Sequence, residues 1–209
     1  MNTYPVASRK QPILSKILLL TICLSTVSCG LQSIPASKNG VEAALAEVNN
    51  QYKRRADLIP NLVSTVKGYA AHEQQTLTEV VEARAKASAV TIDPSKLDPQ
   101  QMQKFQEAQG SLSQALGRLM VVVEKYPDLK ADQNFRDLQA QLEGTENRTT
   151  IARQRYIEAI RIFNDLVTVP PTSWTNSLFY KLEKMPQWAV SESEQQKNEA
   201  PPTVDFGKK

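Results

Sequence analysis

Few side chains of this 209-residue protein have the types and spacing that catalysis requires. His72 is its single histidine, and the sequence contains no CxxC or HExxH motif that would supply metal ligands. Glu143 and Glu146 stand three residues apart on a predicted helix, but three arginines follow them closely. An ion-paired helix face explains that pattern better than general acid–base catalysis. We therefore predict a protein that is not an enzyme, with no catalytic residues, no metal and no cofactor.

Cys29 is the exception, because its surroundings resemble a site of lipid attachment. Three basic residues precede an apolar run at 17–28, which is the order of an export signal. As a helix this run would reach only about 18 Å, less than the thickness of a bilayer core. The quartet Thr26-Val27-Ser28-Cys29 resembles a bacterial lipobox, although Thr26 stands where an aliphatic residue is usual. We predict a lipoprotein signal peptide at 1–28 and palmitate on Cys29; a signal retained as an anchor is the alternative.

Removal of this signal would change the charge balance of the protein. The whole chain has 25 Lys and Arg against 22 Asp and Glu, and the signal contains only bases, so the mature chain is neutral. A neutral chain lacks the basic surface that nucleic acids require, so we expect no nucleic-acid partner. Gly30 follows Cys29, where Asp would favour the inner membrane. We therefore expect a lipid-anchored protein of the bacterial envelope, in the outer membrane of a diderm host.

The elements that position these residues are predicted to be helices. Only 7 glycines and 6% aromatic residues disfavour a β-sandwich or barrel. Apolar residues recur every three or four positions over 41–88, 99–125 and 132–167, which indicates three long amphipathic helices. Asp98-Pro99 is typical of a helix start, and an aromatic stretch at 173–185 predicts a short helix.

These elements predict an all-α fold, an antiparallel up-and-down helical bundle of three long helices plus a short C-terminal helix. The bundle would occupy residues 41–185. A flexible tether at 29–40, rich in small and polar residues, would join it to the lipid. A loose polar tail would follow at 186–209.

Three long segments resemble the LemA family of bacterial membrane-associated proteins. They are YKRRADLIPNLVSTVKGYAAHE (52–73), LMVVVEKYPDLKADQNFRDLQAQLEGTENRTTIARQRYIEAI (119–160) and PPTVDF (201–206). The resemblance covers residues 41–206 and implies an antiparallel helical bundle, membrane association and no established enzymatic activity. Many members retain a transmembrane helix, for which this chain would substitute a lipid. The stretch TVPPTSWTNSLFYKLEKM (168–185) departs from the Gly-rich apolar segment usual in the family.

A set of polar residues lies on or beside the apolar stripes within the segments that carry this resemblance. The set comprises Arg55, Asp57, Asn61, Thr145, Glu146, Asn147 and Thr149. Polar groups in a bundle seam must be hydrogen-bonded, and charged groups must be paired. We interpret the set as a polar layer that fixes the register of the helices; a partner-binding site is the alternative.

Pro60 lies inside the first long helical pattern. A proline in a helix interior removes a backbone hydrogen bond at a cost of about 3 kcal/mol. We predict a kink at Pro60, with residues 41–59 leaving the bundle as a stalk. Its apolar stripe would bind a second copy, as a short coiled coil, or a membrane partner, or be covered by the C-terminal tail folding back. Two alternatives stay open: Asp57 caps a new helix at this point, or the proline is tolerated without a role.

Three functions are compatible with these observations. The first is a non-enzymatic, lipid-anchored scaffold or adaptor for envelope proteins, with the partner unknown. The second is a membrane-associated assembly or membrane-shaping protein, for which Trp174, Phe179, Tyr180 and Trp188 would supply the membrane-facing surface. The third is a binder of a ligand within the bundle core.

Overall fold

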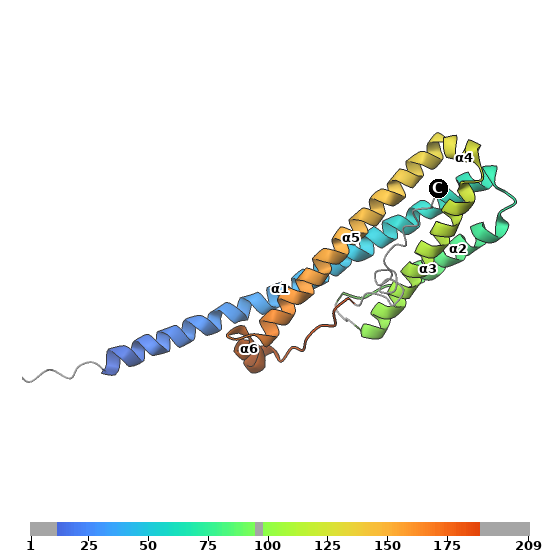
Figure 1. The fold of residues 1–209 in the computed structure, drawn as a ribbon. Helices are drawn as coiled ribbons and strands as arrows, with labels where there is room; N and C mark the ends of the chain where they lie inside the picture. Colours follow the sequence, from blue (N-terminus) through green and yellow to red (C-terminus); the bar gives the residue numbers. More distant parts are fainter. Residues whose placement is uncertain (1–11, 95–97, 189–209) are drawn as a thin grey trace, which may run out of the picture. The chain divides into compact units, whose positions relative to one another are not determined.

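The computed structural model describes residues 12–94 and 98–188, and for residues 12–30 it describes only the course of the backbone. The regular structure in these ranges is helical, which confirms the predicted all-α class. Figure 1 shows α1 (Pro12–Tyr69), α2 (Gln74–Ala89), α3 (Pro99–Val123), α4 (Pro127–Ala131), α5 (Gln133–Thr168) and α6 (Thr172–Thr175), and the π-helix η1 (Asn176–Tyr180) follows. The signal peptide, the lipidation at Cys29 and the tail beyond residue 188 fall outside the residues whose side chains are described.

The chain divides into two compact units. The larger comprises residues 41–160 together with the segment that begins at Pro186, and the smaller comprises residues up to Gly40 together with 161–185. Both α1 and α5 contribute residues to each unit.

The larger unit is an antiparallel bundle in which the chain reverses direction between α1 and α2, α2 and α3, and α3 and α5 (Figure 1). Apolar residues spaced by three and four along each helix meet in one core. Its fully buried members include Ile59, Leu62, Val66, Val80, Leu112, Leu119 and Leu129. Asp98 caps α3 as predicted, because its Oδ1 accepts the backbone N–H of Gln100 at 3.0 Å and Pro99 begins the helix.

The single helix predicted for 41–88 is wrong, because α1 ends at Tyr69 and α2 begins at Gln74. No proline marks the break, and Gly68 is the only weak stop signal nearby. The turn directs α2 back along α3, and Leu77 and Val80 are buried there. A continuous helix would have carried those side chains beyond the bundle and left them in water.

The predicted stalk is also wrong, because residues 41–59 belong to the core. Val41, Leu45 and Val48 are fully buried. The ring of Tyr52 packs edge-to-face against Phe105 of α3, with ring centroids 5.1 Å apart. The bundle itself therefore covers the stripe that we had assigned to a second copy or a membrane partner.

Two further expectations about α1 need correction. Residues 31–40, predicted as a flexible tether, are helical and continuous with the bundle helix. The helix also continues through Pro60, so Asp57 does not cap a new helix. A bend at Pro60 within this continuous helix remains a prediction.

The smaller unit is held together by asparagine side chains that bind backbone groups. The amide of Asn176 donates to the carbonyls of Val167 and Leu182, and its oxygen accepts the N–H of Leu182 at 3.0 Å. Asn164 of α5 likewise donates to the carbonyl of Met185 and accepts its N–H at 2.9 Å. These bonds fasten the segment after η1 to the end of α5, where the sequence had predicted only a short helix.

Candidate functional site

The polar set contains one ion pair between helices. Arg55 of α1 is buried, and its Nη1 lies 2.8 Å from Oε2 of Glu146 on α5. The two side chains differ in exposure, at 8% for Arg55 and 48% for Glu146. The carboxylate therefore stays partly solvated while it neutralises a guanidinium that has lost most of its water. Both partners of this pair were in the set predicted from sequence.

Thr145 and Thr149 are fully buried, as their place on the apolar stripe predicts. Their hydroxyls donate within α5, to the carbonyls of Leu142 at 2.7 Å and Thr145 at 2.9 Å. Short hydroxyl side chains often satisfy themselves in this way inside a helix. These bonds do not cross between helices, so the two threonines do not build the polar layer that we predicted.

Asp57, Asn61 and Asn147 are exposed, so they lie outside a buried polar layer, and their alternative role in a partner-binding site stays a prediction. At about 100° per residue, positions two residues from Arg55 or Thr145 lie on the opposite side of the helix. Asn61 instead borders a polar surface hollow of about 450 Å³ between α1 and α5. Within the predicted set, Arg55 and Glu146 pair between two helices, and Thr145 and Thr149 are hydrogen-bonded within α5.

Pro60 is accommodated by a side chain from another helix. In an α-helix the N–H of residue 60 would bind the carbonyl of Ala56, and proline has no N–H. Nε of Arg84, on α2, donates to that carbonyl at 2.8 Å. Sequence reasoning missed Arg84: the proline identifies the carbonyl that is freed but carries no signal about the donor.

A second proline in α1 shows the same arrangement in the smaller unit. Pro35 frees the carbonyl of Leu31, and the hydroxyl of Tyr180 donates to that oxygen at 2.7 Å. A side chain distant in sequence thus satisfies the freed carbonyl in both cases. Pro35 and Pro60 thus each mark a point where another element attaches to α1.

Two tyrosine–carboxylate hydrogen bonds join the turns at one end of the bundle. Tyr69 donates to Asp132 at 3.0 Å, and Tyr126 donates to Glu73 at 3.2 Å. The bond to Asp132 raises the pKa of Tyr69, whereas for Tyr126 burial is the larger cause of a raised pKa. The backbone N–H of Phe135 lowers the pKa of Asp132, which caps α5. These bonds stabilise the turn at 70–73 that the sequence had not indicated.

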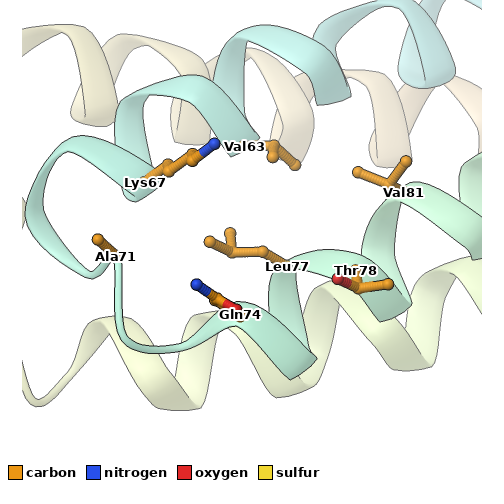
Figure 2. A pocket seen from close by; sticks show the side chains of 7 residues that line it. All are labelled: Val63, Lys67, Ala71, Gln74, Leu77, Thr78 and Val81. Carbon is orange, nitrogen blue, oxygen red and sulfur yellow. The ribbon is translucent and has the colours of Figure 1, made fainter.

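A surface hollow of about 330 Å³ lies between the end of α1 and α2 (Figure 2). Figure 2 shows Leu77 projecting into the space between the two helices. The lining residues are Val63, Lys67, Ala71, Gln74, Leu77, Thr78 and Val81. Lys67 is the one titratable group in that lining, so the hollow offers no acid–base pair.

The residues first considered for chemistry are not brought together. His72 is exposed in the turn after α1. Glu143 accepts from Gln139 one helical turn away, while Glu146 binds Arg55. Among the residues that the structure describes, no group of three His, Cys, Asp or Glu side chains could hold a metal ion. In the same ranges, no helix has both the length and the hydropathy that crossing a bilayer demands.

Tyr156 is a buried polar residue that the sequence analysis did not single out. Its hydroxyl has no hydrogen-bond partner among the described residues, and its ring packs edge-to-face against Trp188 with centroids 5.9 Å apart. Burial raises the pKa of Tyr156 to about 12. Trp188, which we had placed in the loose tail, therefore packs against α5 of the bundle.

Comparison with known proteins supports the resemblance noted from the sequence. Protein LemA of Metamycoplasma hominis is 25% identical over 146 residues, which make up 70% of this chain and 62% of that protein. The alignment therefore leaves more than a third of that relative unmatched. The model of the LemA family matches residues 44–206, the part of the chain that includes the whole bundle core from Leu45 onward. This chain therefore belongs to the LemA family.

Proposed function

We propose that this protein is a non-enzymatic scaffold of the bacterial envelope, anchored to the membrane by a lipid on Cys29. The observation that carries the proposal is the lipobox-like quartet Thr26-Val27-Ser28-Cys29 at the end of the apolar run at 17–28. The helical path of α1 supports it, because the backbone continues from Cys29 into the bundle without a break. A lipid at that position would tether the chain to the membrane surface.

The absence of enzymatic activity is part of this proposal. Three polar side chains of the bundle are used in bonds that hold its elements together. Arg55 pairs with Glu146, Arg84 donates to the carbonyl of Ala56, and Tyr69 donates to Asp132 at the start of α5. The two hollows described above are open at the surface and lack paired acids and bases. A bundle of this kind offers outer helix faces for protein partners.

The chain offers a matched control for the lipidation test, because it contains Cys23 and Cys29. Cells would be labelled with a palmitate analogue, and the protein would be followed through membrane fractionation. Cys29→Ser should abolish labelling and release or misprocess the protein. Cys23→Ser, within the apolar run, should leave labelling and membrane retention unchanged. Labelling that persists in Cys29→Ser would exclude the lipid anchor.

The scaffold role requires a separate test. Crosslinking in intact envelopes through a photoreactive residue at Ile151 or Ile157, both exposed on α5, should give a discrete adduct. The same probe at Val121, exposed on α3, serves as a positional control. The absence of an adduct at both Ile151 and Ile157, or an adduct at Val121 indistinguishable from theirs, would argue against a specific partner on α5.

A further inference from the structure

We propose that the exposed apolar surface of α6 and η1, formed by Trp174, Leu178 and Phe179 and called here the aromatic knob, inserts into the lipid headgroup region of the membrane. The inference rests on the proposed function in one respect: it assumes that the lipid on Cys29 places that residue at the membrane surface. It adds a second, side-chain contact with that membrane.

The three large apolar side chains of the knob are mostly exposed. The exposed fractions are 62% for Trp174, 70% for Leu178 and 59% for Phe179. Exposed apolar side chains that gather on one short element mark an interaction surface. Tryptophan and phenylalanine are the side chains that favour the boundary between lipid and water.

The knob is built rigidly despite this exposure. The buried Asn176 at the start of η1 holds the following segment through two bonds to Leu182 and binds the carbonyl of Val167 in α5 through a third. Lys181 adopts a left-handed conformation with φ 52°, which turns the chain directly after Tyr180. The backbone of the knob is thus folded before it binds, so binding would lose little backbone conformational entropy.

The position of the knob identifies the bilayer as its occupant. Tyr180, adjacent to Phe179, donates its hydroxyl to the carbonyl of Leu31 at 2.7 Å. Leu31 follows Cys29 by two residues, about 3 Å along a helix. The knob therefore attaches to α1 within one helical turn of the residue that would carry the lipid, where the headgroup region must lie.

The charges next to the knob fit the same surface. Lys181 and Lys184 are exposed directly after η1, with the exposed Glu183 between them. Lysine side chains at a membrane boundary extend toward the headgroups while their methylene stems stay in the apolar layer. A net positive charge beside the knob suits anionic bacterial lipids.

The two tryptophans of the chain make the proposal measurable, because Trp174 lies in the knob and Trp188 packs against Tyr156 in the bundle. The mature lipidated protein, from Cys29 onward, would be reconstituted into phosphatidylethanolamine–phosphatidylglycerol vesicles that contain lipid brominated near the headgroup. In Trp188→Phe, bromine should lower the emission of Trp174 at least about twofold, since interfacial side chains reach about 5–10 Å into the bilayer. In Trp174→Phe, the emission of Trp188 should be nearly unchanged.

Substitutions at exposed positions test the cause of the quenching without threatening the fold. Leu178→Ser with Phe179→Ser, in the Trp188→Phe background, should remove most of the quenching of Trp174. Val121→Ser, equally exposed at 67% on α3, should leave it intact. Circular dichroism would verify that each variant remains helical.

The outcomes separate this inference from the lipid anchor. Palmitate labelling reports on Cys29 alone, and bromine quenching reports on Trp174 alone. A labelled protein whose Trp174 is not quenched refutes the knob–lipid contact and leaves a protein partner as its occupant. An unlabelled protein whose Trp174 is quenched refutes the anchor at Cys29 and supports the knob.

Discussion

Replacing Arg84 with methionine tests whether a side chain has taken over the hydrogen bond that Pro60 removes from α1. Nε of Arg84 donates to the carbonyl of Ala56 at 2.8 Å, and Arg84 is half-buried. A hydrogen bond from a charged donor contributes about 1.5–3 kcal/mol. Because Arg84 keeps contact with water, we expect Arg84→Met to lower the free energy of unfolding by about 1.5 kcal/mol, at the low end of that range.

The coupling between positions 60 and 84 is the decisive quantity. Pro60→Ala restores an N–H that can bind the carbonyl of Ala56 within α1. In that background Arg84→Met should cost less than about 0.5 kcal/mol, because the carbonyl keeps a donor. The double-mutant cycle should therefore give a coupling energy of about 1 kcal/mol. Pro60→Ala alone should stabilise by less than the roughly 3 kcal/mol by which proline and alanine differ in a helix interior, since Arg84 already compensates part of the loss.

Urea unfolding followed by far-UV circular dichroism would measure these free energies. Equal m-values among the variants would show that each exposes the same surface on unfolding. Arg118→Met is the matched control, because Arg118 forms an exposed ion pair with Glu79 at 3.0 Å and should cost less than about 0.5 kcal/mol. If Arg84→Met costs the same in both backgrounds, Arg84 acts through some other contact. The account of how α1 accommodates Pro60 would then fail.

Two further predictions concern the buried polar groups of the bundle. Glu146→Ala should lower the free energy of unfolding by about 2–3 kcal/mol, because it leaves the buried guanidinium of Arg55 unpaired. Arg55→Met should lower it by only about 1 kcal/mol, because water can solvate the carboxylate that remains. The opposite order in urea titrations would contradict this reasoning. Burial raises the pKa of Tyr156 to about 12, so the folded protein holds a proton that the unfolded chain releases above pH 10, and stability should fall as pH rises from about 10 toward 12. Tyr156→Phe should reduce that slope in alkaline titrations, and an unchanged slope would locate its cause elsewhere.

The sequence alone determined the fold class and the buried face of each helix. The spacing of three and four placed Val41, Leu45, Val66 and Leu119 on apolar stripes, and all four are fully buried. The start of α3 was also predictable, because Asp98 and Pro99 act within one turn. Such signals are local: the residue and the backbone group it satisfies lie a few positions apart.

The candidate site was predictable only in part, for a related reason. Polar residues on a buried stripe must find partners, which singled out Arg55 together with Thr145 and Thr149. Which partner each one takes depends on neighbours that spacing does not specify. Arg55 reaches Glu146 on another helix, whereas the threonines bind carbonyls of α5. Asp57 and Asn147 face water because the helical turn places them opposite the stripe.

The tertiary structure decided what covers each face and where the long helical pattern turns back. Apolar residues keep a helical spacing at Val66 and Ala70 and again at Leu77 and Val80, while the stripe positions between them are the polar Glu73 and Gln74. The chain reverses at 70–73 because burial of α2 against α3 outweighs a longer helix that would end in water. Pro35 and Pro60, inside α1, each free the carbonyl four residues back, so the sequence identifies that acceptor. The donors, Arg84 and Tyr180, come from elements distant along the chain, so only the folded packing could identify them.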